Sequence, residues 1–280
     1  MNKEILIICR GGGDLATGIV HRLFRAGYQV LILETAEPAA IRRQVSFCEA
    51  VYEGTATVEG VTAERIYTAK KQAVEEVLQR GRIPLLVDPD GRSIEVLKPD
   101  VVVDAIIAKK NLGTYKEMAP LVIGIGPGFV AGEDVHLVVE SMRGHNLARI
   151  LETGSALANT GIPGNIGGYT KERVIHAVAE GYMKNLHQIG DVVRKGEKIA
   201  RIYEQMSPEG VFSGRFVSVE ATIPGVLRGL IREGYHFQKG FKIADIDPRE
   251  SELANCFTIS DKASSIGGSV LEAVCRYVNG

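Results

Sequence analysis

The chain has 280 residues, 45% of them hydrophobic and 24% charged, which is ordinary for a soluble globular protein. The formal net charge is −1, so there is no basic excess to neutralise the phosphates of a nucleic acid. Aromatic residues make up 6% and tryptophan is absent, which leaves few rings on which bases could stack. The length favours two domains, and we expect no nucleic-acid partner.

The cysteines Cys9, Cys48, Cys256 and Cys275 are far apart and form no C-x-x-C pair. The histidines show no H-x-x-x-H or H-E-x-x-H spacing, so we predict no metal site. No apolar run approaches the roughly 20 residues that span a bilayer, and the N-terminus does not resemble a signal peptide. We therefore expect a cytoplasmic protein that has no membrane contact and keeps its cysteines reduced.

The first 34 residues predict a strand, a glycine turn, a helix and a second strand. Residues 4–9 are a continuous apolar run, typical of a strand buried on both faces of a parallel sheet. Leu15, Ile19 and Leu23 recur at helical spacing, and Gly27 can end that helix. Residues 28–33 form the next apolar run, so the segment is a βαβ unit.

The alternation of predicted helices and strands continues to about residue 150. We predict helices over 38–50 and 70–80, and strands over 85–87, 101–107 and 121–125. Residues 1–152 therefore predict a Rossmann-like, doubly wound, nucleotide-binding α/β domain.

An internal repeat dominates the second half. Residues 181–202 align with residues 225–246 at a constant offset of 44. Two copies are too few for a solenoid, so we expect them to pair with pseudo-two-fold symmetry. The string G-D-x-V-x-x-G-E-x-I-A resembles the hairpin of biotinyl/lipoyl modules, although no carrier lysine is apparent. The resemblance implies a β-rich barrel-sandwich hybrid over 153–250.

Two further segments complete the predicted organisation. The glycine-dense stretch 160–168 predicts a hinge or loop. Residues 251–280 contain Ser260 as a candidate N-cap and predict a C-terminal helix that packs back on one of the domains.

The turn after the first strand fits a dinucleotide-binding fingerprint. Gly11, Gly12 and Gly13 would let a backbone approach a pyrophosphate, and Leu15 lies in the first turn of the helix that follows. Glu34 lies 21 residues past Gly13, where a carboxylate would bind ribose hydroxyls and favour NAD over NADP. We therefore predict NAD or a related dinucleotide as cofactor.

Asp14 opposes this prediction, because it lies where the pyrophosphate would bind. At ~4 Å and an effective dielectric near 20, two like charges repel by about 4 kcal/mol. Either Asp14 turns away or the crevice takes another ligand; alternatively, Asp14 only caps the helix. Arg10 could compensate from the strand end.

Two more loops follow predicted strands, at the sheet edge where open α/β proteins bind ligands. The first contains Lys109, which suits an anionic ligand or is simply solvated. The second contains Gly126 and Gly128, which could hold a phosphate or serve a tight turn.

The sequence identifies no catalytic residue outright. His145 lies near the expected domain junction and could transfer protons, although a lone histidine is more often structural. Cys256 precedes the last helix, where an exposed thiolate would be activated. Together with Asp14 and Lys109 they are the catalytic candidates, and whether the protein is an enzyme stays open.

Several strings together resemble one family, the YqeB-like accessory proteins of selenium-dependent molybdenum hydroxylases, distantly related to the XdhC/CoxI maturation factors. These strings are GGGDLATG (11–18), DAIIAKKNLGT (104–114), GIGPGF (124–129), RGH (143–145) and KIADIDPR (242–249).

The resemblance implies an accessory factor that matures a molybdenum hydroxylase and binds a dinucleotide, such as a molybdopterin dinucleotide, in its crevice. The implied partner is that enzyme or its cofactor machinery, and self-association stays open. Glu34 supports the alternative of an NAD-dependent oxidoreductase acting on a small molecule. A non-catalytic adaptor is the third hypothesis.

Overall fold

The computed structural model describes residues 5–159, 161 and 164–280. Residue 4 of the predicted first strand, and residues 160, 162 and 163 of the predicted hinge, lie outside the described residues. The chain forms two compact units. The sheet unit comprises Met1–Pro38, Val45–Thr160 and Ile259–Gly280, and the repeat unit comprises Ala39–Gln44 and Gly161–Thr258. No helix in the described residues is long and apolar enough to cross a membrane.

In the described part of the sheet unit, nine strands form one sheet in the order β3-β4-β5-β2-β1-β6-β7-β8-β9. The neighbours from β4 to β8 run parallel, whereas β3 pairs with β4, and β9 with β8, antiparallel. The strands are β1 (Leu6–Arg10), β2 (Gln29–Glu34), β3 (Thr55–Val58), β4 (Val61–Ile66), β5 (Ile83–Val87), β6 (Val101–Asp104), β7 (Leu121–Ile125), β8 (Leu137–Val139) and β9 (Ile150–Leu151).

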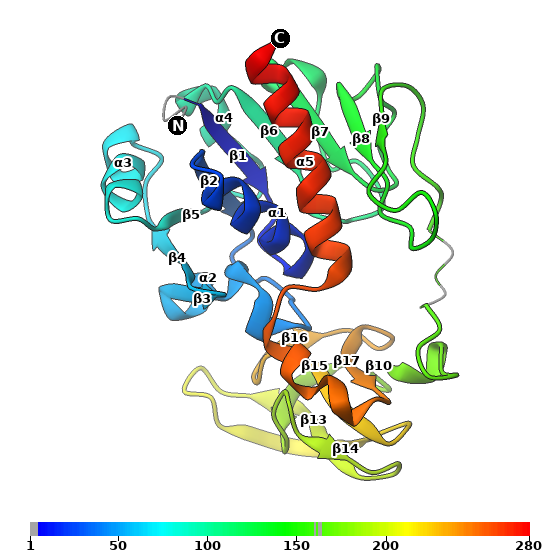
Figure 1. The fold of residues 1–280 in the computed structure, drawn as a ribbon. Helices are drawn as coiled ribbons and strands as arrows, with labels where there is room; N and C mark the ends of the chain where they lie inside the picture. The colour runs from blue at the N-terminus through cyan, green and yellow to red at the C-terminus, as the bar shows by residue number, and fades with distance from the viewer. Residues whose placement is uncertain (1–4, 160, 162–163) are drawn as a thin grey trace. The chain divides into compact units, whose positions relative to one another are not determined.

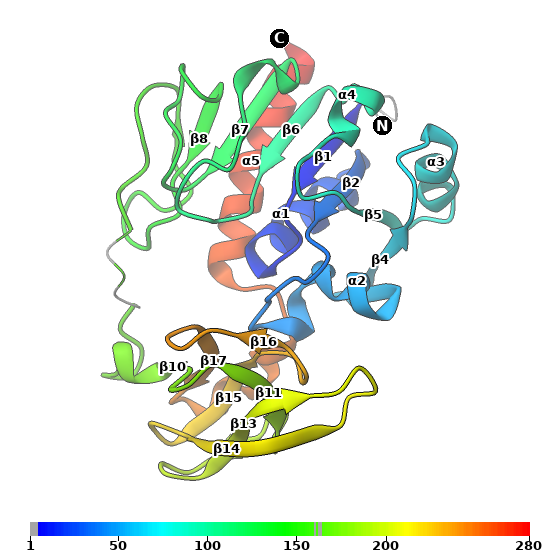
Figure 2. The same cartoon turned by 180° about the vertical axis from the view of Figure 1, so that it is seen from behind.

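Helices cover both faces of this sheet because its central strands are apolar on both sides. Along β1, Ile7 and Cys9 join the core beneath α1 and α5, whereas Ile8 joins the core that includes residues of α3 and α4. Figures 1 and 2 show α5 running alongside α1. The helices are α1 (Asp14–Arg25), α2 (Ala50–Glu53), α3 (Lys71–Gln79), α4 (Ser93–Leu97) and α5 (Asp261–Asn279).

The predicted helix over 38–50 is wrong. Residues Ala39–Gln44 belong to the repeat unit, where the Leu230 N–H donates to the Ile41 carbonyl at 2.9 Å and Arg43 Nε donates to the Leu230 carbonyl at 2.7 Å. These non-local hydrogen bonds replace helical ones, and only short 3₁₀ turns and α2 follow before β3.

The repeat unit contains two four-stranded antiparallel sheets in its described residues, in the orders β10-β17-β15-β12 and β14-β13-β11-β16. The strands are β10 (Val174–His176), β11 (Gly181–Asn185), β12 (Val192–Val193), β13 (Lys198–Met206), β14 (Phe212–Glu220), β15 (Gly225–Leu230), β16 (His236–Phe237) and β17 (Lys242–Asp247).

The two sequence copies form equivalent strands and exchange them. In the first copy β11 pairs with β13, and in the second β15 pairs with β17. Each copy also lends a short strand to the other, because β16 pairs with β11 and β12 pairs with β15. Gly181 (φ +152°) and Gly225 (φ +145°) occupy matching positions, where a Cβ would collide with a strand carbonyl.

The predicted fold class, a Rossmann-like doubly wound domain followed by a biotinyl/lipoyl-like barrel-sandwich hybrid, is wrong. The observed fold is mixed α/β, with one large, mainly parallel sheet and two antiparallel sheets. After β6 and β7 the glycine-containing segments form loops and a 3₁₀ turn in place of crossover helices. Helix α5, from the far end of the chain, packs on α1. In the described residues the repeat strands form two separate sheets rather than a closed barrel.

Candidate functional site

Four parallel strands, β1, β6, β7 and β8, end at the same edge of the large sheet, and the predicted ligand loops follow the first three. Ligands of open α/β sheets bind at this carboxyl edge. The predicted strand 101–107 ends at Asp104, because the backbone beyond it turns. The loops that follow β1, β6 and β7 are in direct contact, as described below.

Two of the three glycines in the first loop are explained by contacts within the protein. Gly11 has φ +98°, and a Cβ on it would lie 2.9 Å from the Ala105 carbonyl oxygen. A Cβ on Gly12 would lie 3.1 Å from the Cys48 nitrogen, and the Cys48 N–H donates to the Gly12 carbonyl at 2.8 Å. These glycines allow loops to pack backbone to backbone, so they are not by themselves evidence of a bound pyrophosphate.

Gly13 differs, because a Cβ on it would meet no atom within 4 Å. Gly13 has an ordinary φ of −67° and is the N-cap of α1, where no side chain caps the helix. Asp14 is the first helical residue and not the N-cap, and its Oδ1 accepts from the Leu15 N–H at 2.9 Å. The amino end of α1 therefore has open space beside it and one carboxylate turned onto its first turn.

Glu34 does not present a free carboxylate. Its Oε2 accepts from the Gly12 N–H at 2.7 Å and its Oε1 accepts from the Thr35 N–H at 2.8 Å. Burial raises the pKa of Glu34, and these two N–H groups oppose the rise. The residue predicted to recognise ribose instead ties the end of β2 to the glycine loop.

Beneath the loops lies a buried polar network. Arg10 is 2% exposed and its Nη1 lies 3.7 Å from Asp104 Oδ2, which also accepts from the Thr114 hydroxyl at 2.5 Å. Burial raises the pKa of Asp104, while Thr114, the Ile106 N–H and Arg10 oppose the rise. Arg10 therefore anchors the loop after β6 and is not placed to compensate for Asp14 at the surface.

The anchored loop has an unusual backbone. Ile107 (φ +60°) and Lys109 (φ +63°) are both left-handed, a conformation that costs of order 1–3 kcal/mol for non-glycine residues and clusters at functional sites. Lys109 and Lys110 are exposed, and neither has an ion-pair partner in the described part of the chain. A Cβ on Gly128 would lie 2.8 Å from the Lys110 backbone, so the loop after β7 packs against this one.

The end of β8 adds two buried polar residues. Glu140 is 3% exposed, and its carboxylate accepts from the Met142 N–H at 2.6 Å and the Leu157 N–H at 2.8 Å. Ser141 lies against Gly126, where a Cβ would collide with the serine hydroxyl. Gly126 therefore serves close packing at a φ of +79°.

Helix α5 contributes a lysine to the same edge. The helix packs on α1 so closely that a Cβ on Gly18 would lie 2.7 Å from Ala263. Burial, and then the Arg143 guanidinium, lower the pKa of Lys262, against the carboxylates of Asp14, Glu140 and Asp261. Arg143 donates to the Asp261 carboxylate from Nη1 at 2.7 Å and from Nη2 at 2.9 Å. The amino ends of α1 and α5 thus share one charged cluster.

The remaining predicted residues do not join this cluster. His145 is exposed in the turn that follows Arg143. Cys256 belongs to the repeat unit, is 1% exposed, and has a pKa that burial raises, so the expected exposed thiolate is wrong. In the described residues no group of three or more His, Cys, Asp and Glu side chains could hold a metal ion.

Sequence reasoning missed Glu140, Ser141 and Lys262. The first two directly follow the apolar run of β8 and could have been found by extending the strand-end argument by one strand. Lys262 is separated from Asp14 by most of the chain, and no local pattern links the two.

The fold and the site define a mixed α/β protein with a cationic loop at the carboxyl edge of its large sheet. No family model matches the chain. A curated relative, the uncharacterized protein YqeB of Escherichia coli K12, is 46% identical over 274 residues, which are 98% of this chain and 48% of the relative. The chain spans about half the length of the curated relative it matches.

Solved structures show only remote likeness. An aspartoacylase family protein from Mesorhizobium loti is 10% identical and matches 89% of this chain and 86% of its own, with a TM-score of 0.31. The product-bound ectoine utilization protein EutE (DoeB) from Ruegeria pomeroyi is 11% identical and matches 87% and 85%, with a TM-score of 0.28. Likenesses this weak assign no function to this chain.

These comparisons correct the assignment made from the sequence strings. The curated relative carries no functional description, and the similar structures are named for ectoine utilization and as an aspartoacylase family protein. The predicted molybdenum hydroxylase accessory family, and with it the maturation, oxidoreductase and adaptor functions, are therefore wrong. The expectation of a molybdenum hydroxylase as partner depended on that resemblance and stays a prediction.

Proposed function

We propose that this protein binds a small anionic molecule, one that carries a phosphate or a carboxylate, at the carboxyl edge of its nine-stranded sheet. The observation that carries the proposal is the loop after β6, where Ile107 and Lys109 are left-handed and the lysines 109 and 110 have no ion-pair partner in the described residues. The buried Arg10–Asp104–Thr114 network holds that loop in place. A strained, firmly anchored loop that presents cations is typical of a ligand site.

The neighbouring groups support the same chemistry. Gly13 leaves open space at the amino end of α1, where the helix dipole and main-chain N–H groups favour an anion. Lys262 adds a partly buried ammonium group from α5. The carboxylates of Asp14 and Glu140 act on the same lysine, so an anionic ligand competes with them for Lys262.

The expectation that the ligand is NAD or a related dinucleotide, such as a molybdopterin dinucleotide, stays a prediction. It loses its strongest local argument, because the Glu34 carboxylate already accepts from the Gly12 and Thr35 N–H groups. We therefore put pyrophosphate, NAD, NADP, NADH, ATP, CTP, S-adenosylmethionine and succinate in one binding panel. A ligand at 100 times its dissociation constant stabilises the folded state by about 2.7 kcal/mol, which thermal unfolding detects.

The decisive variants are Gly13→Asp and Gly13→Asn, which fill the same open space and both cap the helix well. Only the aspartate adds negative charge, so we expect calorimetry to show at least about tenfold weaker anion binding for Gly13→Asp than for Gly13→Asn. Equal affinities would place the ligand elsewhere and overturn the proposal.

A second pair of variants tests the loop itself. Lys109→Asn removes the charge while keeping a residue that accepts the left-handed conformation, and we expect it to weaken binding. Lys71→Met, at an exposed lysine of α3, is the control and should leave affinity unchanged. If the two variants bind equally well, Lys109 does not contact the ligand.

A further inference from the structure

A row of aromatic side chains crosses the outer face of the sheet β14-β13-β11-β16. Phe216 lies directly opposite Tyr203, Tyr203 opposite Tyr182, and Tyr182 opposite His236. Directly opposite residues of antiparallel strands point to the same face. Ring centroids are 5.1 Å apart for Tyr203 and Phe216, and 4.7 Å apart for Tyr182 and His236.

This face points away from the core of the repeat unit. The strand neighbours of these rings, Met183, Ile202 and Phe237, are at most 3% exposed and belong to that core. By contrast Phe216 is 47% exposed, although it is a large apolar residue. His236 is also exposed, and Tyr182 and Tyr203 are partly exposed, so the row presents ring surface to solvent. Exposed apolar surface of this kind marks binding sites.

Two cationic side chains lie on the same face, each two residues along its strand from a tyrosine of the row. Arg201 is opposite Lys184, and its Cζ lies 4.6 Å from the Phe216 ring centroid. Lys184 Nζ lies 5.0 Å from the Phe212 ring centroid but pairs with Glu233 at 2.9 Å. Among the described residues the Arg201 guanidinium has no hydrogen-bond or ion-pair acceptor, and its Nε is buried without a partner. The Arg201 guanidinium is thus available to bind an external anion.

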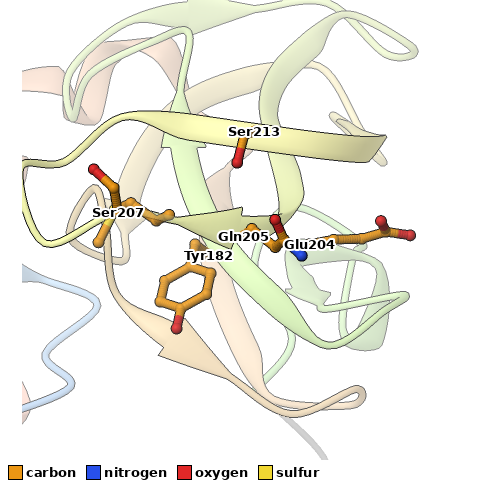
Figure 3. Close-up of a pocket in the computed structure, with 6 residues that line it drawn as sticks. Tyr182, Glu204, Gln205, Ser207 and Ser213 are labelled. Carbon is orange, nitrogen blue, oxygen red and sulfur yellow. The ribbon is translucent and has the colours of Figure 1, made fainter.

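On the other side of the row is an open hollow of about 340 Å³. Figure 3 shows Tyr182, Gln205 and Ser213 reaching it from three neighbouring strands. In the described chain the phenol, the carboxamide and the hydroxyl of these three residues form no side-chain hydrogen bonds, so each keeps its donors and acceptors. Met206 adds an apolar patch to the lining. The volume is at the small end of the ~300–1,000 Å³ range of small-molecule sites.

We propose that this sheet face is a second ligand site, which binds a nucleoside monophosphate or a similar flat ring that carries a phosphate. The rings of Tyr203 and Phe216 offer stacking surfaces, because every base has a π-face. The planar guanidinium of Arg201 matches a phosphate, and the uncharged polar groups of the hollow suit the polar edge of a base. A long single strand fits less well, because the face holds one unpaired cation and the chain has a net charge of −1.

The test is calorimetric titration of the whole chain with AMP, GMP, CMP and UMP, and with adenosine and inorganic phosphate as partial ligands. We expect a monophosphate to bind at least about tenfold more tightly than its nucleoside, because Arg201 adds charge-assisted hydrogen bonds. Arg201→Met should remove that difference, whereas Arg194→Met, at an exposed arginine of the same unit, should keep it.

The stacking contribution is tested separately. Tyr203→Leu should weaken monophosphate binding by about fivefold or more, and Phe216→Leu, at an exposed position that folding does not need, should act in the same direction. Repeating the titration with Gly13→Asp keeps this site distinct from the one at the large sheet, because that variant should leave it unaffected.

The proposal fails if none of the four monophosphates binds at millimolar concentration, or if Arg201→Met and Phe216→Leu leave their affinity unchanged. It also fails if a four-nucleotide single strand binds while the monophosphates do not, because the face would then recognise a polymer.

Discussion

The Glu34 carboxylate ends β2 with both oxygens bound to main-chain N–H groups, in surroundings that raise its pKa through burial. A carboxyl whose pKa is higher in the folded than in the unfolded state binds its proton more tightly when folded. The stability that this tighter proton binding contributes is therefore fully present below the unfolded-state pKa, near 4.3, and is lost as the pH rises from there through the higher folded-state pKa. Glu34 holds the glycine loop, and its negative charge destabilises the folded state at neutral pH.

We predict opposite pH behaviour for two substitutions at this position. Glu34→Gln keeps an oxygen for the Gly12 N–H and removes the ionisation, so its stability relative to the natural protein should increase as the pH rises from about 4 to 7. Glu34→Ala leaves the Gly12 N–H without its acceptor and should be destabilised by about 1–3 kcal/mol throughout. Urea unfolding at several pH values measures both, and a flat profile for Glu34→Gln would contradict the account.

Helices α1 and α5 pack through small residues, which lets their backbones approach. A Cβ on Gly18 would lie 2.7 Å from Ala263, and a Cβ on Gly267 would lie 2.6 Å from the Gly18 carbonyl oxygen. This close approach brings the amino end of α5, with Lys262, to the amino end of α1. The charged cluster of the candidate site therefore depends on a packing contact between residues far apart in sequence.

The contact predicts a reversal of the usual effect of alanine in a helix. Gly18→Ala should destabilise the protein by about 1–3 kcal/mol through overpacking, although alanine is the better helix former. Gly268→Ala, in α5 with no atom within 4 Å of its Cβ, should instead stabilise by up to about 1 kcal/mol. Thermal unfolding of the two variants decides the matter, and stabilisation by both would mean that the helices can move apart.

Both units are assembled from segments that are distant in the chain. The sheet unit takes α5 from the C-terminal end, and the repeat unit takes Ala39–Gln44 from the first fifth of the chain. In the repeat unit the Ile41 side chain lies where a Cβ on Gly229 would come within 2.6 Å, and its carbonyl accepts from Leu230. The segment adds to β15 one main-chain hydrogen bond and one from the Arg43 side chain, which the repeat itself does not provide.

Removing the Ile41 side chain should loosen the repeat unit locally. We expect Ile41→Ala to cost about 1–2 kcal/mol and to speed hydrogen exchange at the Leu230 N–H, while the amides of β1 in the sheet unit keep their protection. Val96→Ala, at a valine that is 70% exposed, is the matched control. Unchanged exchange at Leu230 would show that the segment is not needed there.

Much of the local structure followed from the sequence. The apolar runs of β1, β2 and β7, the helical spacing of α1 and α3, and the Ser260 cap of α5 all form where their patterns predict. The internal repeat, at an offset of 44 residues, likewise predicted that two copies pair, and they exchange strands. Such features depend on residues close in sequence or on direct similarity, so periodicity and capping reveal them.

The tertiary structure decided the fold class and the site. Gly11 and Gly12 fit a dinucleotide fingerprint, yet packing against Ala105 and Cys48 explains them. Glu34 has the right spacing for ribose, yet it binds Gly12. A glycine motif indicates only that some group approaches the backbone closely at that position. Contacts between distant segments decide whether that group is a ligand or another part of the protein. Non-local packing, which leaves no local pattern, joined Lys262 to the site and laid the Tyr203 row across four strands.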